Sequence, residues 1–463
     1  MELTTAELKN HPELVAVHGI LYNLEQFAPH HPGGNHIQGA GAYDASALYA
    51  SMHPGQKPTN SALFQKYRVG VHVRTHQDIT YQYDSPFAIE LLHIIRTSMR
   101  KKSWWAPLGF YLRIACIALA TLYCEWQFMF TGAVVWAVLV GVCHSQIGLS
   151  IQHDASHGAL SKSFAVNDFF AYGADWIGNS KWIWFQQHIL WHHPHTNHPE
   201  LDPDASSAEP LIKFQNTNKH DASTNFWFTP HQHLVLHAVL SLYGPSIVYN
   251  PLVILTMKHN ANIPTTVGQS KYMTEQKIIA CVFRLFYYAR IVVLPWYIGQ
   301  ASLFVSVVVP SLVTGMLLTF VFIVSHNFMG TDRDPTHTEQ QKKQKQKQKQ
   351  DEFLRVVASK KEEDAADPAA PICWYKAQAE TSCTYGGTIG MLLTGGLNLQ
   401  IEHHLFPRLS SWYYPMVQDD IRACCARHQV KYAYFPTLAH NMWSMLQYIR
   451  KVGMTAALKE HAH

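Results

Sequence analysis

Charged residues and cysteine frameworks are both scarce in this chain. Only 15% of its 463 residues are charged, and the formal net charge at pH 7 is +4. A charge this small gives no global basic field, so the sequence does not predict nucleic-acid binding. The eight cysteines show neither a zinc-type CxxC spacing nor a disulfide-like pattern. Their usage favours a reducing compartment.

No secretory signal peptide is expected at the start of the chain. Met1 to His11 is polar, and no apolar stretch precedes a small-residue cleavage site there. We therefore expect the N-terminus to stay in the cytosol.

Histidine, in contrast, is abundant. The chain has 30 histidines against 36 lysines and arginines together, and many of the histidines fall in tight clusters. Histidine clusters without a cysteine framework predict metal binding.

Four apolar stretches are each close to the roughly 20 residues that a membrane-spanning helix needs. Arg284 and Arg290 lie in the third stretch, where a charge is costly at mid-membrane unless it reaches the interface or pairs. The basic cluster at 100–102, before the first stretch, marks a cytosolic side. The stretches, which form two hairpins, are 107–124, 128–150, 278–297 and 301–325.

A further apolar region, 234–256, is interrupted by His237, Pro245 and Pro251. We expect this region to lie at the membrane interface instead of spanning it. The number of crossings on either side of it is then even, so that all the histidine clusters stay on one cytosolic face.

These segments predict a multi-domain chain with a small α+β domain followed by an all-α integral membrane domain of about four helices. We expect the N-terminal domain over 1–75, a linker over 76–104, the membrane domain over 105–440 and a C-terminal tail over 441–463. A Lys/Gln-rich segment inside the membrane domain, about 338–366, is expected to be a disordered insertion.

The N-terminal domain carries a candidate haem site. His31 precedes Pro-Gly-Gly, and His53 follows it 22 residues later. Two axial histidines are what a six-coordinate, electron-transferring haem needs. Together with the Tyr43-Asp44-Ala45 segment, this spacing resembles the cytochrome b5 fold over roughly 15–75. We assign the ligand to His31 and not to the adjacent His30, because His31 directly precedes Pro-Gly-Gly.

Three histidine boxes follow in the membrane domain. The first two, HDASH and HILWHH, each contain an i, i+4 pair, which one face of a helix would present together. Seven histidines are too many for one tetrahedral zinc, so two metals are implied. Imidazole suits several metals, but a fused one-electron donor is useful to iron and not to zinc. The candidate ligands are His153, His157, His188, His192, His193, His403 and His404.

Three other residues near the boxes are candidates for additional or supporting roles. His326, at the end of the fourth apolar stretch, is a candidate extra ligand. Asn398 either holds a metal-bound water or is simply a turn residue. Gln400 stands at the first position of the third box, QIEHH.

The haem motif and the three boxes, in this order around two apolar hairpins, resemble those of the front-end acyl desaturases over nearly the whole chain. Gln400 is typical of that family. Segments such as Asp202-Pro203-Asp204 and Leu405-Phe406-Pro407-Arg408 are similar to those of algal enzymes, and the diatom-type Δ5 enzymes are the most similar. The resemblance implies an O₂-dependent enzyme that introduces a cis double bond between an existing double bond and the carboxyl end of a polyunsaturated fatty acyl chain. Δ5 is the favoured position, ahead of Δ4 and Δ6.

The same resemblance implies two non-haem iron ions, haem b, O₂ as co-substrate and electrons from NAD(P)H through a cytochrome b5 reductase. The substrate would be a polyunsaturated acyl-phospholipid or acyl-CoA among membrane lipids, with no nucleic-acid partner. The expected location is the endoplasmic reticulum membrane, with the haem domain and the boxes facing the cytosol. No side chain beyond the metal site is expected to act as a catalytic acid or base.

Other functions use the same features. A sphingolipid long-chain-base desaturase or a lipid hydroxylase would need the same boxes, and a membrane haem protein that only relays electrons would use them as structural or zinc sites. Trp182, Trp184 and Trp191 near the second box either line an acyl channel or belong to an interfacial aromatic belt.

Overall fold

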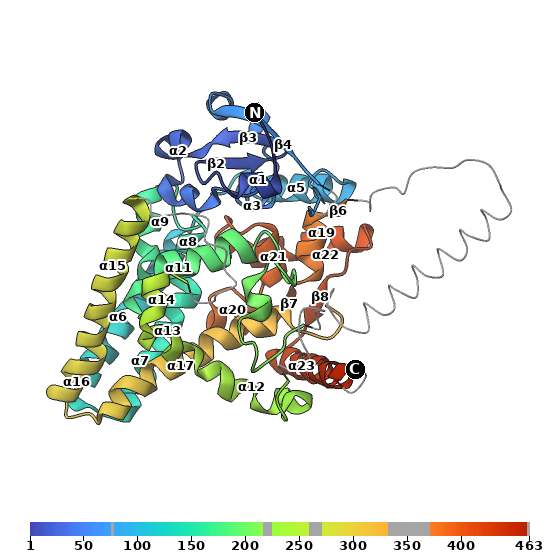
Figure 1. The fold of residues 1–463 in the computed structure, drawn as a ribbon. Helices are drawn as coiled ribbons and strands as arrows, with labels where there is room; N and C mark the ends of the chain where they lie inside the picture. Colours follow the sequence, from blue (N-terminus) through green and yellow to red (C-terminus); the bar gives the residue numbers. More distant parts are fainter. Residues whose placement is uncertain (76–77, 216–224, 259–270, 332–370, 461–463) are drawn as a thin grey trace, which may run out of the picture.

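The computed structural model shows an N-terminal domain packed on a helical bundle (Figure 1). The expected Lys/Gln-rich insertion at about 338–366 lies outside the described residues. The residues that the structure describes are 1–75, 78–215, 225–258, 271–331 and 371–460.

A four-stranded sheet and short helices form the N-terminal domain, which confirms the predicted small α+β fold. The strand order is β1-β4-β3-β2, with β4 parallel to β1 and antiparallel to β3. All four residues of β2 are buried, because this strand faces the helices and the next domain. The elements are β1 (Glu2–Thr4), α1 (Thr5–Leu8), β2 (Leu14–Val17), β3 (Ile20–Asn23), α2 (Leu24–Phe27), α3 (Ser46–Met52), α4 (Ala62–Gln65) and β4 (Arg68–Val73).

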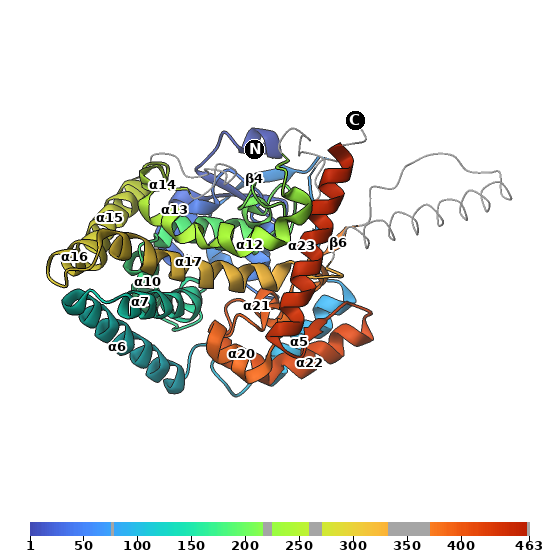
Figure 2. The ribbon, with the colours of Figure 1, turned by 90° about the horizontal axis from the view of Figure 1, so that it is seen from below.

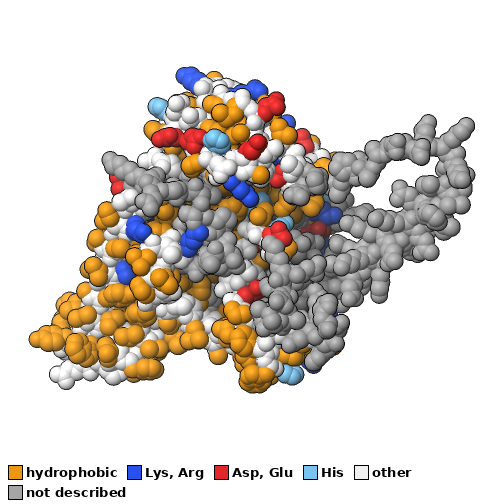
Figure 3. All heavy atoms as spheres, in the orientation of Figure 1, with side chains coloured by type: hydrophobic (Ala, Val, Ile, Leu, Met, Phe, Trp, Pro, Cys, Tyr) orange, Lys and Arg blue, Asp and Glu red, His pale blue; other side chains and the backbone are white. Residues whose placement is uncertain are grey.

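Four helices are long and apolar enough to cross a membrane, as the sequence predicted. Large hydrophobic side chains are exposed along α6 and α15, and hydrophobic atoms cover that part of the surface in Figure 3, whereas charged side chains gather over the N-terminal domain. An exposed apolar surface of this kind suits contact with lipid. The four helices are Leu108–Thr131 (α6), Val134–Ser156 (which includes α7, Val134–Gln146), Tyr272–Tyr297 (mainly α15, Lys271–Tyr287) and Leu303–His326 (α17).

Both arginines of the third span have polar partners inside the protein. The guanidinium of Arg284 donates to backbone carbonyls at Ile247 and Val248. Arg290 forms an ion pair with Glu125 on α6 at 3.1 Å and lies over the ring of Trp176. Pairing of this kind removes most of the cost of placing a charge within a membrane span.

The apolar region 234–256 does not form a span. It is divided into α12 (Gln232–Ser241), α13 (Tyr243–Tyr249) and α14 (Pro251–Thr256), which pack along α17 and α15. Figure 2 shows α12 and α13 lying along α17. The break at Asn250 has a local cause, because its side chain accepts a hydrogen bond from the Leu252 N–H and the next residue is proline.

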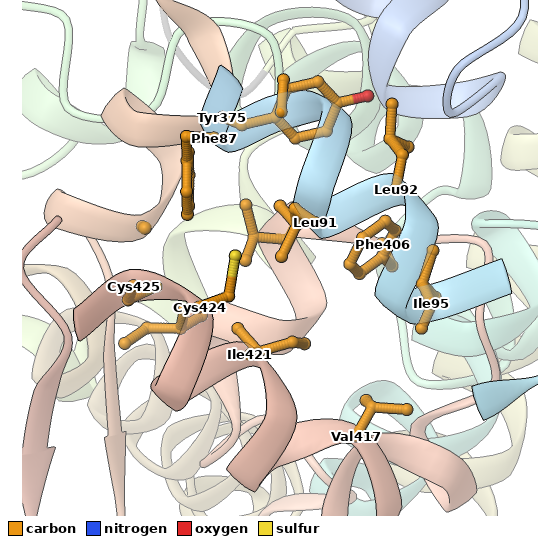
Figure 4. Packing of buried hydrophobic residues seen from close by; sticks show 14 of the residues in the cluster. Phe87, Leu91, Leu92, Ile95, Tyr375, Phe406, Val417, Ile421, Cys424 and Cys425 are labelled. Atoms are coloured by element: carbon orange, nitrogen blue, oxygen red, sulfur yellow. The ribbon is translucent and has the colours of Figure 1, made fainter. Parts of the chain in front are cut away.

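Two segments expected as linker and tail are packed helices instead. The interval 76–104 contains α5 (Pro86–Ser98), whose Phe87, Leu91 and Ile95 pack against α22 (Tyr414–Arg427; Figure 4). Most of 441–463 belongs to α23 (Leu438–Glu460), which is also part of a buried cluster. Their apolar residues recur at helical spacing, which buries one face of each helix.

The structure describes further α-helices and strands. They are β5 (Tyr81–Gln82), α8 (His153–Ser156), α9 (Phe164–Ala171), α10 (Gly173–Trp176), α11 (Lys181–Trp184), α16 (Leu294–Tyr297), β6 (Ile372–Cys373), α19 (Trp374–Glu380), β7 (Cys383–Tyr385), α20 (Gly387–Thr394), α21 (Gln400–Leu405) and β8 (Ala433–Phe435).

The two domains pack directly on each other through glycines. A Cβ atom on Gly34 would lie 2.4 Å from the ring of Phe164, and one on Gly39 would lie 2.6 Å from Leu190 Cδ1. Real Cβ atoms do not approach other atoms so closely, so a larger residue at either position would force Phe164 or Leu190 to shift. The glycines that follow His31 therefore also set how near the N-terminal domain comes to the histidine boxes.

A polar cluster secures the same interface. His36 Nε2 lies 3.2 Å from Asp168 Oδ1, and the Tyr272 hydroxyl lies 2.6 Å from His36 Nδ1. Burial lowers the pKa of His36. Burial alone would raise the pKa of Asp168, but hydrogen bonds from His36 and from the buried Lys181 lower it to about 2. A neutral His36 can donate to Asp168 and accept from Tyr272, so this cluster suits near-neutral pH.

Candidate metal centre

The structure brings together all seven histidines of the three boxes, and His326 joins them. Each is buried. In the first histidine group, one ring nitrogen from each residue lies within 4.8 Å of those of the others. The same holds for the second histidine group, and His193 contacts both groups through His403 and His404. The first group is His153, His157, His188 and His403, and the second is His192, His326 and His404.

The second box contributes to both groups. His188 belongs to the first group and His192 to the second, although their two rings also stack on each other, as the i, i+4 spacing predicted. Phe185–His192 forms a π-helical turn (η5), in which the His193 N–H bonds to the His188 carbonyl. This i, i+5 register places His188 Nε2 and His193 Nε2 3.1 Å apart. Single π-helical turns occur frequently at functional sites.

The outward ring nitrogens of several of these histidines contact fixed oxygen atoms. His192 Nδ1 lies 2.9 Å from Asp202 Oδ2, and His326 Nδ1 lies 3.0 Å from the Thr381 carbonyl. His403 and His404 make further contacts of the same kind, with the Tyr414 hydroxyl at 3.0 Å and the Gln378 side chain at 3.1 Å. Such contacts fix the tautomer and leave Nε2 directed toward the group, as in protein metal sites.

The burial of the rings keeps them uncharged. Burial lowers the pKa of His157, His188, His193, His403 and His404 well below the usual value, and neighbouring histidines lower it further. Metal ligands must be deprotonated, so these neutral rings suit a cation. Among the described residues, neither ring nitrogen of His157 has a hydrogen-bond partner, which leaves both available to a cation. The donor set therefore fits two iron ions.

His192 differs in its electrostatics. Burial alone lowers its pKa, but the carboxylates of Asp202 and Asp204 outweigh that effect and raise it. A paired carboxylate also makes an imidazole a stronger donor to a metal.

The two supporting candidates occupy different positions. Gln400 Nε2 lies 3.1 Å from His326 Nε2 and 3.4 Å from His404 Nε2, which places this side chain at the second histidine group. Asn398 instead donates to the carbonyls of Tyr385 and Gly387. Those contacts favour the turn role for Asn398.

A cavity of about 280 Å³ opens beside the histidines. His188, His192 and His326 line one part of it, and Trp184 and Phe322 form part of an apolar wall. An apolar cavity that ends at convergent polar groups is typical of a small-molecule site.

The three tryptophans have separate environments. Only Trp184 lines the cavity. Trp182 lies next to Gly39, and the ring of Trp191 lies 4.9 Å from that of Tyr43, so both pack against the N-terminal domain. The aromatic-belt interpretation is wrong for all three, because each is buried within the protein.

The candidate haem ligands face each other in the N-terminal domain. The ring centroids of His31 and His53 are 6.2 Å apart. Two imidazoles that bind one metal from opposite sides through bonds of about 2 Å need centroids about 6 Å apart. Burial lowers the pKa of His31, and it lowers that of His53 to about 3, so both rings are neutral. The pair therefore fits a haem iron.

Sequence reasoning missed several supporting residues. Asp202 was noticed only through the family resemblance, and nothing in the sequence marks Tyr414 or Gln378 as neighbours of the boxes. Glu402, inside the third box, was also unassigned. Burial raises its pKa to about 7, and it accepts hydrogen bonds from Tyr432 and Thr384, which anchor α21.

Two family models match the chain. The model described as fatty acid desaturase matches residues 129–436. The model described as cytochrome b5-like haem/steroid binding domain matches residues 2–73.

Three relatives match over more than nine-tenths of their own length. An acyl-lipid (7-3)-desaturase of Rebecca salina is 28% identical over 453 residues, covering 97% of this chain and 93% of the relative. A protein of the same name from Diacronema lutheri is 28% identical over 97% of this chain and 92% of its own. Acyl-lipid (8-3)-desaturase B of Dictyostelium discoideum is 26% identical, over 95% of this chain and 91% of that protein.

Proposed function

Because this chain belongs to the fatty acid desaturase family and carries a cytochrome b5-like domain at its N-terminus, we propose that it is a front-end desaturase of polyunsaturated acyl lipids. It would introduce a cis double bond between an existing double bond and the carboxyl end of the chain. The observation that carries this proposal is the buried pair of histidine groups beside an apolar cavity.

The histidines would hold two iron ions, which supply reductive O₂ activation when bound. The first group, with His193 shared, would bind one ion and the second group the other. Asp202 keeps His192 in the tautomer that presents Nε2, and Tyr414 orients His403. We include His326 among the ligands, because its Nε2 lies in the second group while its Nδ1 contacts the Thr381 carbonyl.

The cavity would hold the acyl chain. Its walls include Trp184, Leu240 and Phe322, and its polar end is formed by His188 and His192. Apolar walls of this kind exclude water and place methylene groups, which offer no polar handle, next to the histidines. No acid or base from the protein is needed at the carbon atoms.

Electrons would arrive through the haem domain, where His31 and His53 hold haem b. We propose that a cytochrome b5 reductase supplies them from NAD(P)H at the cytosolic face of the endoplasmic reticulum. The direct packing of the domain on the second box, through Tyr43 and Trp191, supports transfer within one chain.

The relatives support a lipid-linked substrate, since their names include acyl-lipid (7-3)- and (8-3)-desaturases. We propose acyl-phospholipid before acyl-CoA for this reason. Δ5 remains the first position to test, followed by Δ4 and Δ6.

The test is expression in a yeast that lacks polyunsaturated acids, fed C18 and C20 polyunsaturated acids separately. Mass spectrometry locates any new double bond, and separation of phospholipid from acyl-CoA pools shows where it appears first. His192→Ala should abolish the product. His440→Ala, at an exposed histidine outside both groups, should leave it unchanged.

Other outcomes would redirect the assignment. Hydroxylated product, or product only on sphingolipid bases, would indicate the hydroxylase or the long-chain-base desaturase. Purified protein with haem but no further iron would contradict the di-iron proposal and favour an electron relay.

A further inference from the structure

Arg408 lies between the two proposed cofactor sites. It follows the third histidine box by four residues, and its Nη1 donates to the Met52 carbonyl at 3.2 Å. Met52 directly precedes the proposed haem ligand His53. On its other side, Arg408 Nε lies 3.8 Å from where a Cβ on Gly158 would be, and Gly158 directly follows His157.

The guanidinium carries a positive charge without an anionic partner. Within the part of the chain that the structure describes, no carboxylate lies at ion-pair distance from Arg408. Burial lowers the pKa of Arg408, and no acidic neighbour opposes that effect. A partly buried guanidinium of this kind is stabilised by an anion that pairs with it.

The charge lies next to the proposed haem site. Arg408 Nη1 contacts the carbonyl of Met52, the residue directly before His53. A haem held between His31 and His53 would bring carboxylates of its own, the two propionates, and a planar guanidinium pairs well with a carboxylate.

We propose that Arg408, supplied by the desaturase domain, would bind a propionate of the haem held by His31 and His53. This inference rests on the proposed haem ligation by His31 and His53, and it adds a positioning residue that joins the two domains. Arg408 would thus couple haem loading to docking of the N-terminal domain.

The test measures haem loss from the full-length protein, by transfer to excess apomyoglobin. Arg408→Gln should accelerate loss of natural haem on the order of ten-fold, the effect of removing one charge-assisted hydrogen-bonded pair. In protein reconstituted with haem dimethyl ester, whose propionates are uncharged, the same substitution should cause no acceleration. Equal acceleration with both haems, or none with either, would refute propionate binding.

Arg96→Gln is the matched control. Arg96 also reaches from the second domain to a backbone carbonyl of the first, that of Gly55, at 3.2 Å, but it is exposed. The Arg96→Gln substitution should leave the rate of haem loss unchanged, both with natural haem and with haem dimethyl ester. If Arg408→Gln takes up no haem, the comparison of natural haem with haem dimethyl ester is made on Arg408→Lys instead. Lysine keeps the positive charge but loses the planar pairing with a carboxylate, so Arg408→Lys should still accelerate loss of natural haem alone.

The proposed haem ligation by His31 and His53 has a test of its own, which does not depend on Arg408. If His53→Ala retains the absorption spectrum of a bis-imidazole haem, the ligand assignment is wrong, whatever Arg408 does.

Discussion

The contact between Asp202 and His192 offers a sharp test of the proposed metal centre. Both carboxylate oxygens of Asp202 lie near His192 Nδ1, at 2.9 and 3.1 Å. They also accept the backbone N–H groups of Asn197 and Asp204, at 2.6 and 2.9 Å. Asp202→Asn keeps the shape of the side chain but removes its charge and turns one acceptor into a donor.

Two effects should follow, with different magnitudes. Loss of the carboxylate partner of a metal-binding histidine typically costs 10–100-fold in metal affinity or activity, so we expect a fall of about that size. The NH₂ group of the new amide would also face a backbone N–H, so that two donors oppose each other. This should lower the free energy of unfolding by about 1–3 kcal/mol. The protein should therefore still fold, with weakened iron binding.

The assay compares double-bond product per mole of haem-loaded protein, iron per chain and thermal unfolding. Asp78→Asn is the matched control, because that carboxylate also accepts a backbone N–H, from Thr75 at 2.6 Å, but lies in the interdomain segment. Full activity and two irons per chain in Asp202→Asn would refute the role assigned to this carboxylate.

Three further predictions concern the packing of the chain. Glu125→Ala leaves the guanidinium of Arg290 unpaired and should lower the free energy of unfolding by about 3–5 kcal/mol. Thermal unfolding of the protein in nanodiscs measures this loss, and a change below about 1 kcal/mol would contradict a buried ion pair. Gly39→Ala should force Leu190 to shift and loosen domain docking by about 1–3 kcal/mol, seen as faster interdomain proteolysis; an unchanged proteolysis rate would mean that this contact does not control docking. Because burial lowers the pKa of His36 in the folded state, the unfolded state binds more protons below pH about 6.5, so docking should weaken as the pH falls from about 7 to about 5.5. Asp168, whose pKa is about 2, stays charged over that range, and His36→Gln should reduce the pH dependence measured by hydrogen exchange.

Several features followed from sequence alone because their physical signals are local. The four spans are runs of apolar residues of sufficient length, and the haem motif and boxes are short spacings of a single residue type. α5 was missed as a packed helix because it lies between the haem motif and the first span, although its apolar positions recur at helical spacing.

The division of the second box between the two groups could not be derived from its spacing. The i, i+4 pair His188 and His192 does stack, but the π-helical turn at Phe185–His192 also aligns His188 with His193. A register of this kind depends on packing around the turn and leaves no mark in the sequence.

By itself, the sequence determined the class of the protein: the membrane spans, the haem pair and the number of imidazoles available to metals. Those properties depend on which residues are present and on short spacings along the chain. Tertiary structure decided which histidines share a group, that Asp202 and Tyr414 support them, that His326 joins them, and that Arg408 lies between the two domains. These contacts join residues up to hundreds of positions apart, and only the packing of helices and domains sets such distances.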